Sequence, residues 1–239
     1  MSVMNQYIYH PAAGRGVADY GWLQANYSFS FSRYYNPDMM GFGLLRVLND
    51  DTIAWGAWFP PHGHENMEII TIPQTGSLEH QDNAWWHGVI STGDVQVMSA
   101  WRWVEHSEYN ASATEPATLF QLWIETKDRD IQPRYDQKSF GAIPVDTLRL
   151  LVSNDGRDDS LMIHQDAFIS RASVTIGNVV EYKHRIAGNG VYIFVVSGEV
   201  IVWGQLLWTK DAMGVIGDEK ISIHPQKESD ILIIEVPMV

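Results

Sequence analysis

The sequence predicts an all-β protein built from two similar β-barrel units packed together, with only short helices. Short apolar runs rich in Val, Ile, Phe, Tyr and Trp recur along the 239 residues, bounded by Gly, Asn, Asp and Pro, which is typical of antiparallel strands. No long segment has the apolar period of an amphipathic helix. A weak internal repeat indicates two units, because residues 76–79 and 93–95 resemble residues 197–200 and 211–214.

Three strands can be placed from their apolar pattern. Residues 28–32 alternate Ser and Phe, as expected of a half-buried strand. Residues 119–124 and 191–196 are dominated by large apolar side chains, which predicts strands buried on both faces.

The boundary between the two units is expected near residues 126–142. Charged residues are frequent at 126–130, and the chain then reaches Pro133. We therefore predict a first domain over residues 1–132 and a second over residues 133–239.

Composition excludes several classes of function. With 45% hydrophobic and 19% charged residues, the chain can form a large core. The net charge of −13 argues against direct binding to a nucleic-acid backbone, which needs a basic face. The absence of cysteine excludes disulfides and thiolate ligands. There is no glycine-rich phosphate loop, so no nucleotide cofactor is expected.

The sequence also shows no membrane or secretion signal. Its first residues lack a basic start followed by an apolar run, and no later stretch reaches the roughly 18 apolar residues of a membrane span. We expect a cytoplasmic protein that does not bind a membrane.

Two short segments each place two metal-binding side chains one residue apart: His62 and His64 in one, His106 and Glu108 in the other. In a β-strand, positions i and i+2 lie on one face, roughly 6.5 to 7 Å apart. A lone histidine is more often a surface or hydrogen-bonded residue, but two such pairs in one β-rich region favour a site for one divalent ion. Imidazole and carboxylate ligands suit iron, nickel, cobalt, manganese, copper and zinc alike.

Short strings of residues follow one another along nearly the whole chain in the order and spacing of a known family. They include Gly21-Trp22-Leu23, Leu45-Arg46-Val47, Glu79-His80-Gln81-Asp82, Gly93-Asp94-Val95-Gln96, His106-Ser107-Glu108-Tyr109-Asn110, Pro133-Arg134-Tyr135 and His164-Gln165-Asp166. With the two ligand pairs, these strings resemble the pirin family of the cupin superfamily, most closely its bacterial members.

The resemblance implies two cupin domains with jelly-roll barrels, the first of which holds one divalent transition metal. Its ligands would be His62, His64, His106 and Glu108, with iron the first expectation and no other cofactor; the second domain, which lacks the paired histidines, would hold none. Glu68 also completes the His-x-His-x-x-x-Glu motif of many other cupins. The pirin pattern favours Glu108, and we expect Glu68 to orient a ligating imidazole.

Several pirins are flavonol 2,3-dioxygenases, so the resemblance implies the same reaction here. The substrate would be a small planar molecule that chelates the metal through a hydroxyl next to a carbonyl, as quercetin does. Glu108 would accept the hydroxyl proton, and reaction with O2 would open the ring and release carbon monoxide.

Two other functions stay open from the sequence. Some pirins are metal- and redox-dependent regulators that bind transcription factors or metabolic enzymes, which implies a protein partner. A cupin enzyme acting on another small oxygen chelator, such as a diketone or a catechol, would use the same ligands.

Departures from the family pattern concern the pocket. Trp101 and Trp103 stand where pirins usually have glycine, and Trp85 and Trp86 lie in the preceding loop. These rings would either narrow the pocket, stack on a planar ligand, or cover the barrel rim. His80 is a further candidate for the pocket wall, although a hydrogen-bonded strand residue explains it equally well.

Overall fold

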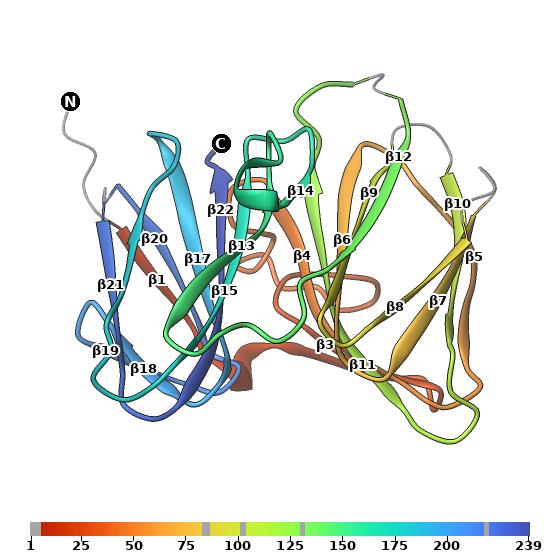
Figure 1. The fold of residues 1–239 in the computed structure, drawn as a ribbon, viewed down its shortest axis with the longest axis horizontal. Helices are drawn as coiled ribbons and strands as arrows, with labels where there is room; N and C mark the ends of the chain where they lie inside the picture. The colour runs from red at the N-terminus through yellow and green to blue at the C-terminus, as the bar shows by residue number, and fades with distance from the viewer. Residues whose placement is uncertain (1–5, 83–86, 101–103, 130–131, 218–219) are drawn as a thin grey trace.

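Two β-barrels lie side by side in the protein (Figure 1). The computed structural model describes residues 6–82, 87–100, 104–129, 132–217 and 220–239. Its described helices are two single 3-10 turns, η1 (Ala12–Gly14) and η2 (Arg157–Asp159). Across the described ranges, no helix has the length and apolar character needed to cross a membrane. The predicted all-β fold with short helices is confirmed.

The first barrel pairs a large sheet with a small one. The strands of the large sheet are β2 (Gly16–Asp19), β3 (Leu23–Tyr27), β4 (Leu45–Ile53), β6 (Met67–Thr75), β9 (Asp94–Ala100), β11 (Ala117–Glu125) and β12 (Arg134–Ser139). Those of the small sheet are β5 (Trp58–His64), β7 (Ser77–Asp82), β8 (His87–Ser91) and β10 (Val104–Asn110). The orders are β12-β9-β6-β11-β4-β3-β2 and β5-β10-β7-β8.

The second barrel repeats this plan. Its large sheet consists of β1 (Gln6–His10), β13 (Thr147–Ser153), β14 (Leu161–Met162), β15 (Phe168–Val174), β17 (Asn189–Ser197), β20 (Ala212–Ile216) and β22 (Ser229–Pro237). Its small sheet consists of β16 (Val180–Lys183), β18 (Glu199–Val202), β19 (Gln205–Trp208) and β21 (Lys220–Pro225). The orders are β1-β20-β17-β22-β15-β13-β14 and β16-β21-β18-β19.

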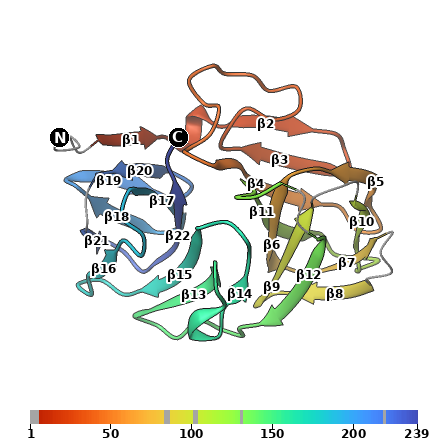
Figure 2. The ribbon, with the colours of Figure 1, turned by 90° about the horizontal axis from the view of Figure 1, so that it is seen from above.

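Each half of the chain contributes a strand to the other half's sheet. The N-terminal strand β1 pairs with β20 of the second barrel, and β12 pairs with β9 of the first (Figure 2). No single cut in the chain therefore separates the two large sheets. The division into residues 1–132 and 133–239 stays a proposal for the two domains.

Two of the three strands expected from the apolar pattern are confirmed. Residues 119–124 lie within β11 and residues 191–196 within β17. Residues 28–32, however, do not form a strand: β3 ends at Tyr27, and Phe31 makes only an isolated bridge to Tyr34. The backbone turns here instead of extending, with Ser32 in the left-handed region at φ 53°.

The alternation of β11 explains how one strand serves two environments. Phe120, Leu122 and Ile124 point into the apolar core between the barrels, where the Phe120 and Phe194 rings meet edge to face at 5.5 Å. Gln121, on the opposite face, points into the first barrel and lines its cavity. Neither face of the strand is exposed to solvent over this segment, so the sequence lacks a simple polar and apolar alternation.

The internal repeat in the sequence corresponds to equivalent turns in the two barrels. Gly76 joins β6 to β7 with φ 74°, and Gly198 joins β17 to β18 with φ 94°. Both glycines adopt the left-handed conformation that a side chain would strain. Each turn carries the chain from the large sheet of its barrel to the small one.

The interior of the second barrel is apolar where the first carries its candidate ligands. In order within their sheets, β16 and β21 correspond to β5 and β10, and they pair Val180 with Ile223 and Tyr182 with Ile221. All four side chains belong to one buried apolar cluster. This packing supports the proposal that the second barrel binds no metal.

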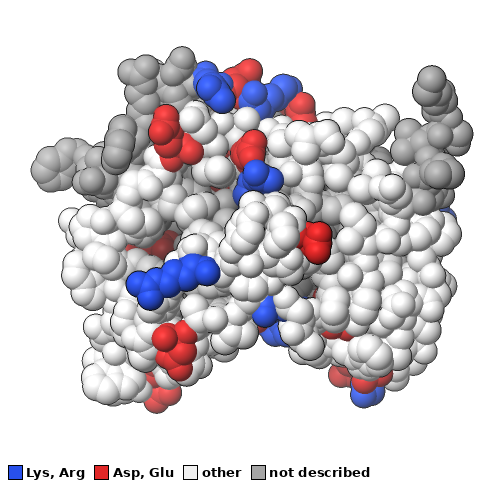
Figure 3. Space-filling model, turned by 180° about the vertical axis from the view of Figure 1, so that it is seen from behind, with Lys and Arg blue, Asp and Glu red and all other residues white. Residues whose placement is uncertain are grey.

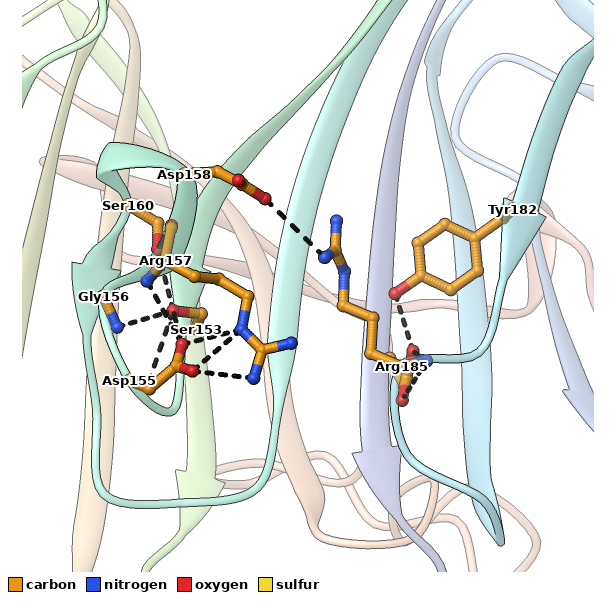
Figure 4. Close-up of polar contacts among 9 residues, drawn as sticks. Ser153, Asp155, Gly156, Arg157, Asp158, Ser160, Tyr182 and Arg185 are labelled. Carbon is orange, nitrogen blue, oxygen red and sulfur yellow. Dashed lines mark hydrogen bonds and ion pairs between the residues drawn. The ribbon is translucent and has the colours of Figure 1, made fainter.

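Hydrogen bonds and ion pairs connect residues of the loops beside the second barrel (Figure 4). Arg157 forms a bidentate pair with Asp155, and the Arg185 guanidinium lies 3.9 Å from Asp158. The Tyr182 hydroxyl donates to the Glu235 carboxylate at 2.8 Å. The Asp155 and Glu235 carboxylates thus accept hydrogen bonds from neighbouring groups of the same half of the chain.

Charges are scattered over the face opposite to that of Figure 1. Among the described residues visible there, Lys and Arg side chains alternate with Asp and Glu and do not form a continuous basic strip (Figure 3). A nucleic-acid backbone would require such a strip.

Candidate metal centre

The strand register brings the two predicted ligand pairs together. In the antiparallel pair of β10 with β5, His106 lies opposite His62, and Val104 lies opposite His64. A bulge between His106 and Glu108 shifts the register, a feature that often re-aims side chains at functional sites. β5 is an edge strand, which is where the prolines preceding His62 are tolerated.

His62 and His64 lie on the same side of β5, as the alternation predicts. Their ring centroids are 4.8 Å apart. The Nδ1 atom of His62 lies 2.8 Å from the Pro60 carbonyl oxygen, so Nδ1 carries a proton and donates it in this contact. A backbone carbonyl holding one ring nitrogen is the usual companion of metal ligation through the other.

His64 is held neutral by its surroundings. It is 6% exposed, and the Trp123 ring packs edge to face against it at 4.6 Å. Burial, with a smaller effect from His62, lowers the pKa of His64 to about 3. A neutral imidazole is the protonation state that binds a metal ion.

Glu108 is a fully buried carboxyl whose hydrogen bonds are incomplete. Its Oε2 atom accepts from Gln121 Nε2 at 3.2 Å, and Gln121 Oε1 accepts from the Trp123 indole at 3.0 Å. Its Oε1 atom has no hydrogen-bond partner among the described residues. Burial raises the pKa of Glu108 to about 7, and the Gln121 hydrogen bond opposes that rise.

The other buried glutamates differ from Glu108 in this respect. Among the described side chains Glu68, Glu108 and Glu235 are 0% exposed. Both oxygens of Glu68 and both oxygens of Glu235 accept hydrogen bonds. Since buried polar atoms are normally satisfied, the Oε1 atom of Glu108 indicates a position prepared for a bound group.

A cavity of about 350 Å³ opens beside His62 and Glu108. Its wall is mainly aromatic, formed by Tyr20, Trp22, Tyr27, Phe31, Phe59 and Trp123. Its polar lining comes from Ser32, Asn49, Asp51 and Gln121. The volume lies within the range of about 300–1,000 Å³ that small-molecule pockets occupy.

These donors fit a divalent transition metal. A neutral buried imidazole, a second imidazole with a defined tautomer and a carboxylate oxygen without a partner make a nitrogen and oxygen donor set suited to such ions. No cluster of three His, Asp or Glu side chains suited to a metal is found within the described part of the chain. The side chain of His106, the remaining predicted ligand, lies outside that part. The ligand set therefore stays a proposal.

Glu68 has a different role from the one expected. It accepts from Ser99 Oγ at 2.6 Å and from the backbone N–H of His164 at 2.9 Å. On β6 its side chain shares the face of Ile70 and Ile72, which belong to the core between the barrels, whereas ligands must face the barrel interior. The structure corrects the prediction: Glu68 joins the two halves of the protein.

The remaining predicted pocket residues are only partly placed. His80 is 0% exposed, lies opposite Glu108 in the pairing of β7 with β10, and packs 4.9 Å from the Tyr135 ring. It is not among the described residues that line the cavity. Trp101 and Trp103 lie outside the described residues, as do Trp85 and Trp86.

Sequence reasoning missed most of the cavity wall. Trp22, Phe31 and Phe59 come from separate segments that only the fold brings together. Asn49 and Asp51 had a signal, since they share alternate positions of β4 with the apolar residues Val47 and Ile53. That pattern could have identified them as inward-facing polar residues.

Comparison with known proteins places this chain in one family. The sequence model described as Pirin matches residues 10–124, and the one described as Quercetinase C-terminal cupin domain matches residues 150–236. A quercetin 2,3-dioxygenase of Escherichia coli strain K12 is 40% identical over 226 residues, which cover 94% of this chain and 96% of that protein. A pirin-like protein of Caulobacter vibrioides is 38% identical over 224 residues, 92% of this chain and 95% of that protein.

A solved structure of a related protein supports the same family. The bacterial pirin YhhW from Escherichia coli, in complex with nickel(II), is 38% identical and superposes with a TM-score of 0.92, covering 98% of this chain and all of that one. The relatives match over nearly their full length, and both barrels are included. This chain therefore belongs to the pirin family.

Proposed function

We propose that this protein is a metal-dependent dioxygenase that cleaves a flavonol such as quercetin with O2 and releases carbon monoxide. The observation that carries the proposal is Glu108 Oε1, a fully buried carboxyl oxygen without a hydrogen-bond partner among the described residues. The residue Glu108 lines the same aromatic cavity as His62. The names of the relatives and the nickel(II) complex of YhhW support the same reaction class.

His62, His64, His106 and Glu108 would hold the metal. When bound, a divalent transition metal supplies the Lewis acidity that favours an ionised substrate hydroxyl and a centre for reaction with O2. Iron is our first expectation from the sequence, and the same donors accept nickel, cobalt, manganese, copper or zinc.

The protein's own groups bind the substrate and move its proton. Flat walls such as Trp22, Phe59 and Trp123 offer stacking surfaces for a planar molecule. Glu108 lines the cavity and would accept the proton of the chelating hydroxyl. The Gln121 amide holds the other carboxyl oxygen, so the proton-accepting atom keeps a fixed position.

Oxygen uptake and carbon monoxide release with quercetin test the proposal. The purified protein is loaded in turn with iron(II), nickel(II), cobalt(II), manganese(II) and copper(II). At least one metal should support turnover, and Glu108→Gln should lower it about 100-fold or more through loss of the base and a ligand. The matched control is Glu65→Gln, an exposed carboxyl next to His64, which should retain full activity. Absence of oxygen uptake with every metal would refute the proposal.

A further inference from the structure

The inward face of β4 is apolar at its two ends and polar in its middle. Val47 and Ile53, at its two ends, are buried apolar residues, as the interior of a barrel requires. Between them on the same face lie Asn49 and Asp51, each only 3% exposed.

Neither polar side chain is satisfied by its neighbours. The Oδ1 atoms of Asn49 and Asp51 are buried without a hydrogen-bond partner among the described residues. Asp51 lies opposite Ala25 on β3 and opposite Leu119 on β11, and neither side chain can form a hydrogen bond with it. Burying such atoms unpaired destabilises a fold, so packing does not explain them.

Gln121 forms no hydrogen bond with Asn49 among the described residues. It lies opposite Asn49 in the pairing of β11 with β4. Its nitrogen already donates to Glu108, and its oxygen already accepts from Trp123. Asn49 Oδ1 therefore stays unpaired although an amide lies opposite it.

Both side chains line the cavity that also contains His62 and Glu108. A ligand in this cavity would meet aromatic walls on most sides and the side chains of Asn49 and Asp51 on β4. Burial, reinforced by Asp50 and Glu108, raises the pKa of Asp51 to about 8. A protonated carboxyl can both donate and accept a hydrogen bond, as a phenol hydroxyl does.

We infer that Asn49 and Asp51 form a subsite that binds a ring hydroxyl of the substrate, away from the two oxygens that chelate the metal. The inference rests on the proposed function and narrows its substrate class to planar chelators that carry such a hydroxyl. A site built to bond a hydroxyl discriminates against an analogue without one, because its buried polar groups then stay unpaired.

The same barrel contains a matched control. Thr71 Oγ1 is also buried without a partner among the described residues, and Thr71 lies opposite Gln121 on β6. Thr71 is not among the described residues that line the cavity. Thr71→Val removes an unpaired polar atom from the barrel interior without touching the proposed subsite.

The test compares binding of quercetin with that of 3-hydroxyflavone, which keeps the chelating oxygens and lacks the other hydroxyls. Binding to the nickel-loaded protein is measured in the absence of oxygen through the quenching of tryptophan fluorescence, since Trp22 and Trp123 line the cavity. The wild type should prefer quercetin about tenfold or more, as one well-placed hydrogen bond allows. Asp51→Leu and Asn49→Leu should reduce the preference to about twofold, and Thr71→Val should keep it.

Two further measurements keep the test decisive. Asp51→Asn retains a donor and an acceptor and should keep most of the preference for quercetin over 3-hydroxyflavone. If Asp51 had a purely structural role, the ratio of the two affinities would be unchanged in every folded variant. An unchanged ratio in folded Asp51→Leu and Asn49→Leu, or an equal loss in Thr71→Val, would overturn the subsite. Oxygen uptake measured on the same preparations reports separately on the proposed reaction.

Discussion

Gln121 Nε2 donates a hydrogen bond to Glu108 Oε2 at 3.2 Å, and this contact is the only one that the described residues provide for the Glu108 carboxyl. Gln121 lies on β11 of the large sheet, whereas Glu108 lies on β10 of the small sheet. The two sheets of the first barrel are thus joined at the candidate metal centre.

Removing this contact should make Glu108 harder to ionise. The Gln121 hydrogen bond lowers the pKa of Glu108, so Gln121→Leu should raise that pKa further above about 7 in the metal-free protein. Carbon-13 NMR titration of the glutamate carboxyls measures the change. Gln226→Leu, at an exposed position in the second barrel, should not alter it. A lower pKa in Gln121→Leu would contradict the assignment of this contact.

The contribution of Glu108 to the stability of the metal-free protein should fall as the pH rises from about 4.5 to about 7. Glu108 keeps its proton in the folded state over this range because its pKa is raised from 4.5, whereas the unfolded chain loses it. The free energy of unfolding should decrease by about 3 kcal/mol more in the wild type than in Glu108→Gln. Urea denaturation at a series of pH values measures the free energy of unfolding of both proteins. If that free energy changes with pH in the same way in both, the pKa of Glu108 is not raised.

Metal binding should stabilise the fold through the histidines of β5. At a nickel(II) concentration about 100 times Kd, binding adds about 2.7 kcal/mol, which corresponds to a rise in Tm of about 5–10 °C for a chain of this size. His64→Ala should abolish the rise. His87→Ala provides the control, because His87 is exposed and pairs with Glu79 at 2.7 Å. An equal rise in His64→Ala would exclude His64 as a ligand.

Glu68→Ala should destabilise the protein without reducing its metal content. The substitution leaves Ser99 Oγ–H and the His164 N–H unpaired at the junction of the two halves, at an expected loss of about 2–4 kcal/mol. Chemical denaturation and elemental analysis measure the two effects. Loss of metal with little change in stability would instead restore the role that the sequence suggested for Glu68. Glu65→Ala, at an exposed position in the turn between β5 and β6, serves as the control.

The sequence by itself determined the fold class, the family and the pairing of His62 with His64. Each of these follows from local order: strand rhythm, strings of matched residues and a two-residue alternation that holds in any extended strand. The expectation for residues 28–32 failed because a local pattern of Ser and Phe also fits a buried turn closed by contacts from elsewhere, such as that of Ser28 N with Leu48 O.

Only the tertiary structure decided what the side chains of Glu68 and Glu108 each contact. Both satisfy a cupin spacing, but β6 turns Glu68 toward the core between the barrels, while Glu108 lines the cavity. The unpaired oxygens of Asn49 and Asp51 and the aromatic wall were likewise beyond the sequence, because whether a polar atom is satisfied depends on strands distant along the chain. Alternation assigns a residue to one of two faces of its strand, and only the packed sheets determine what each face contacts.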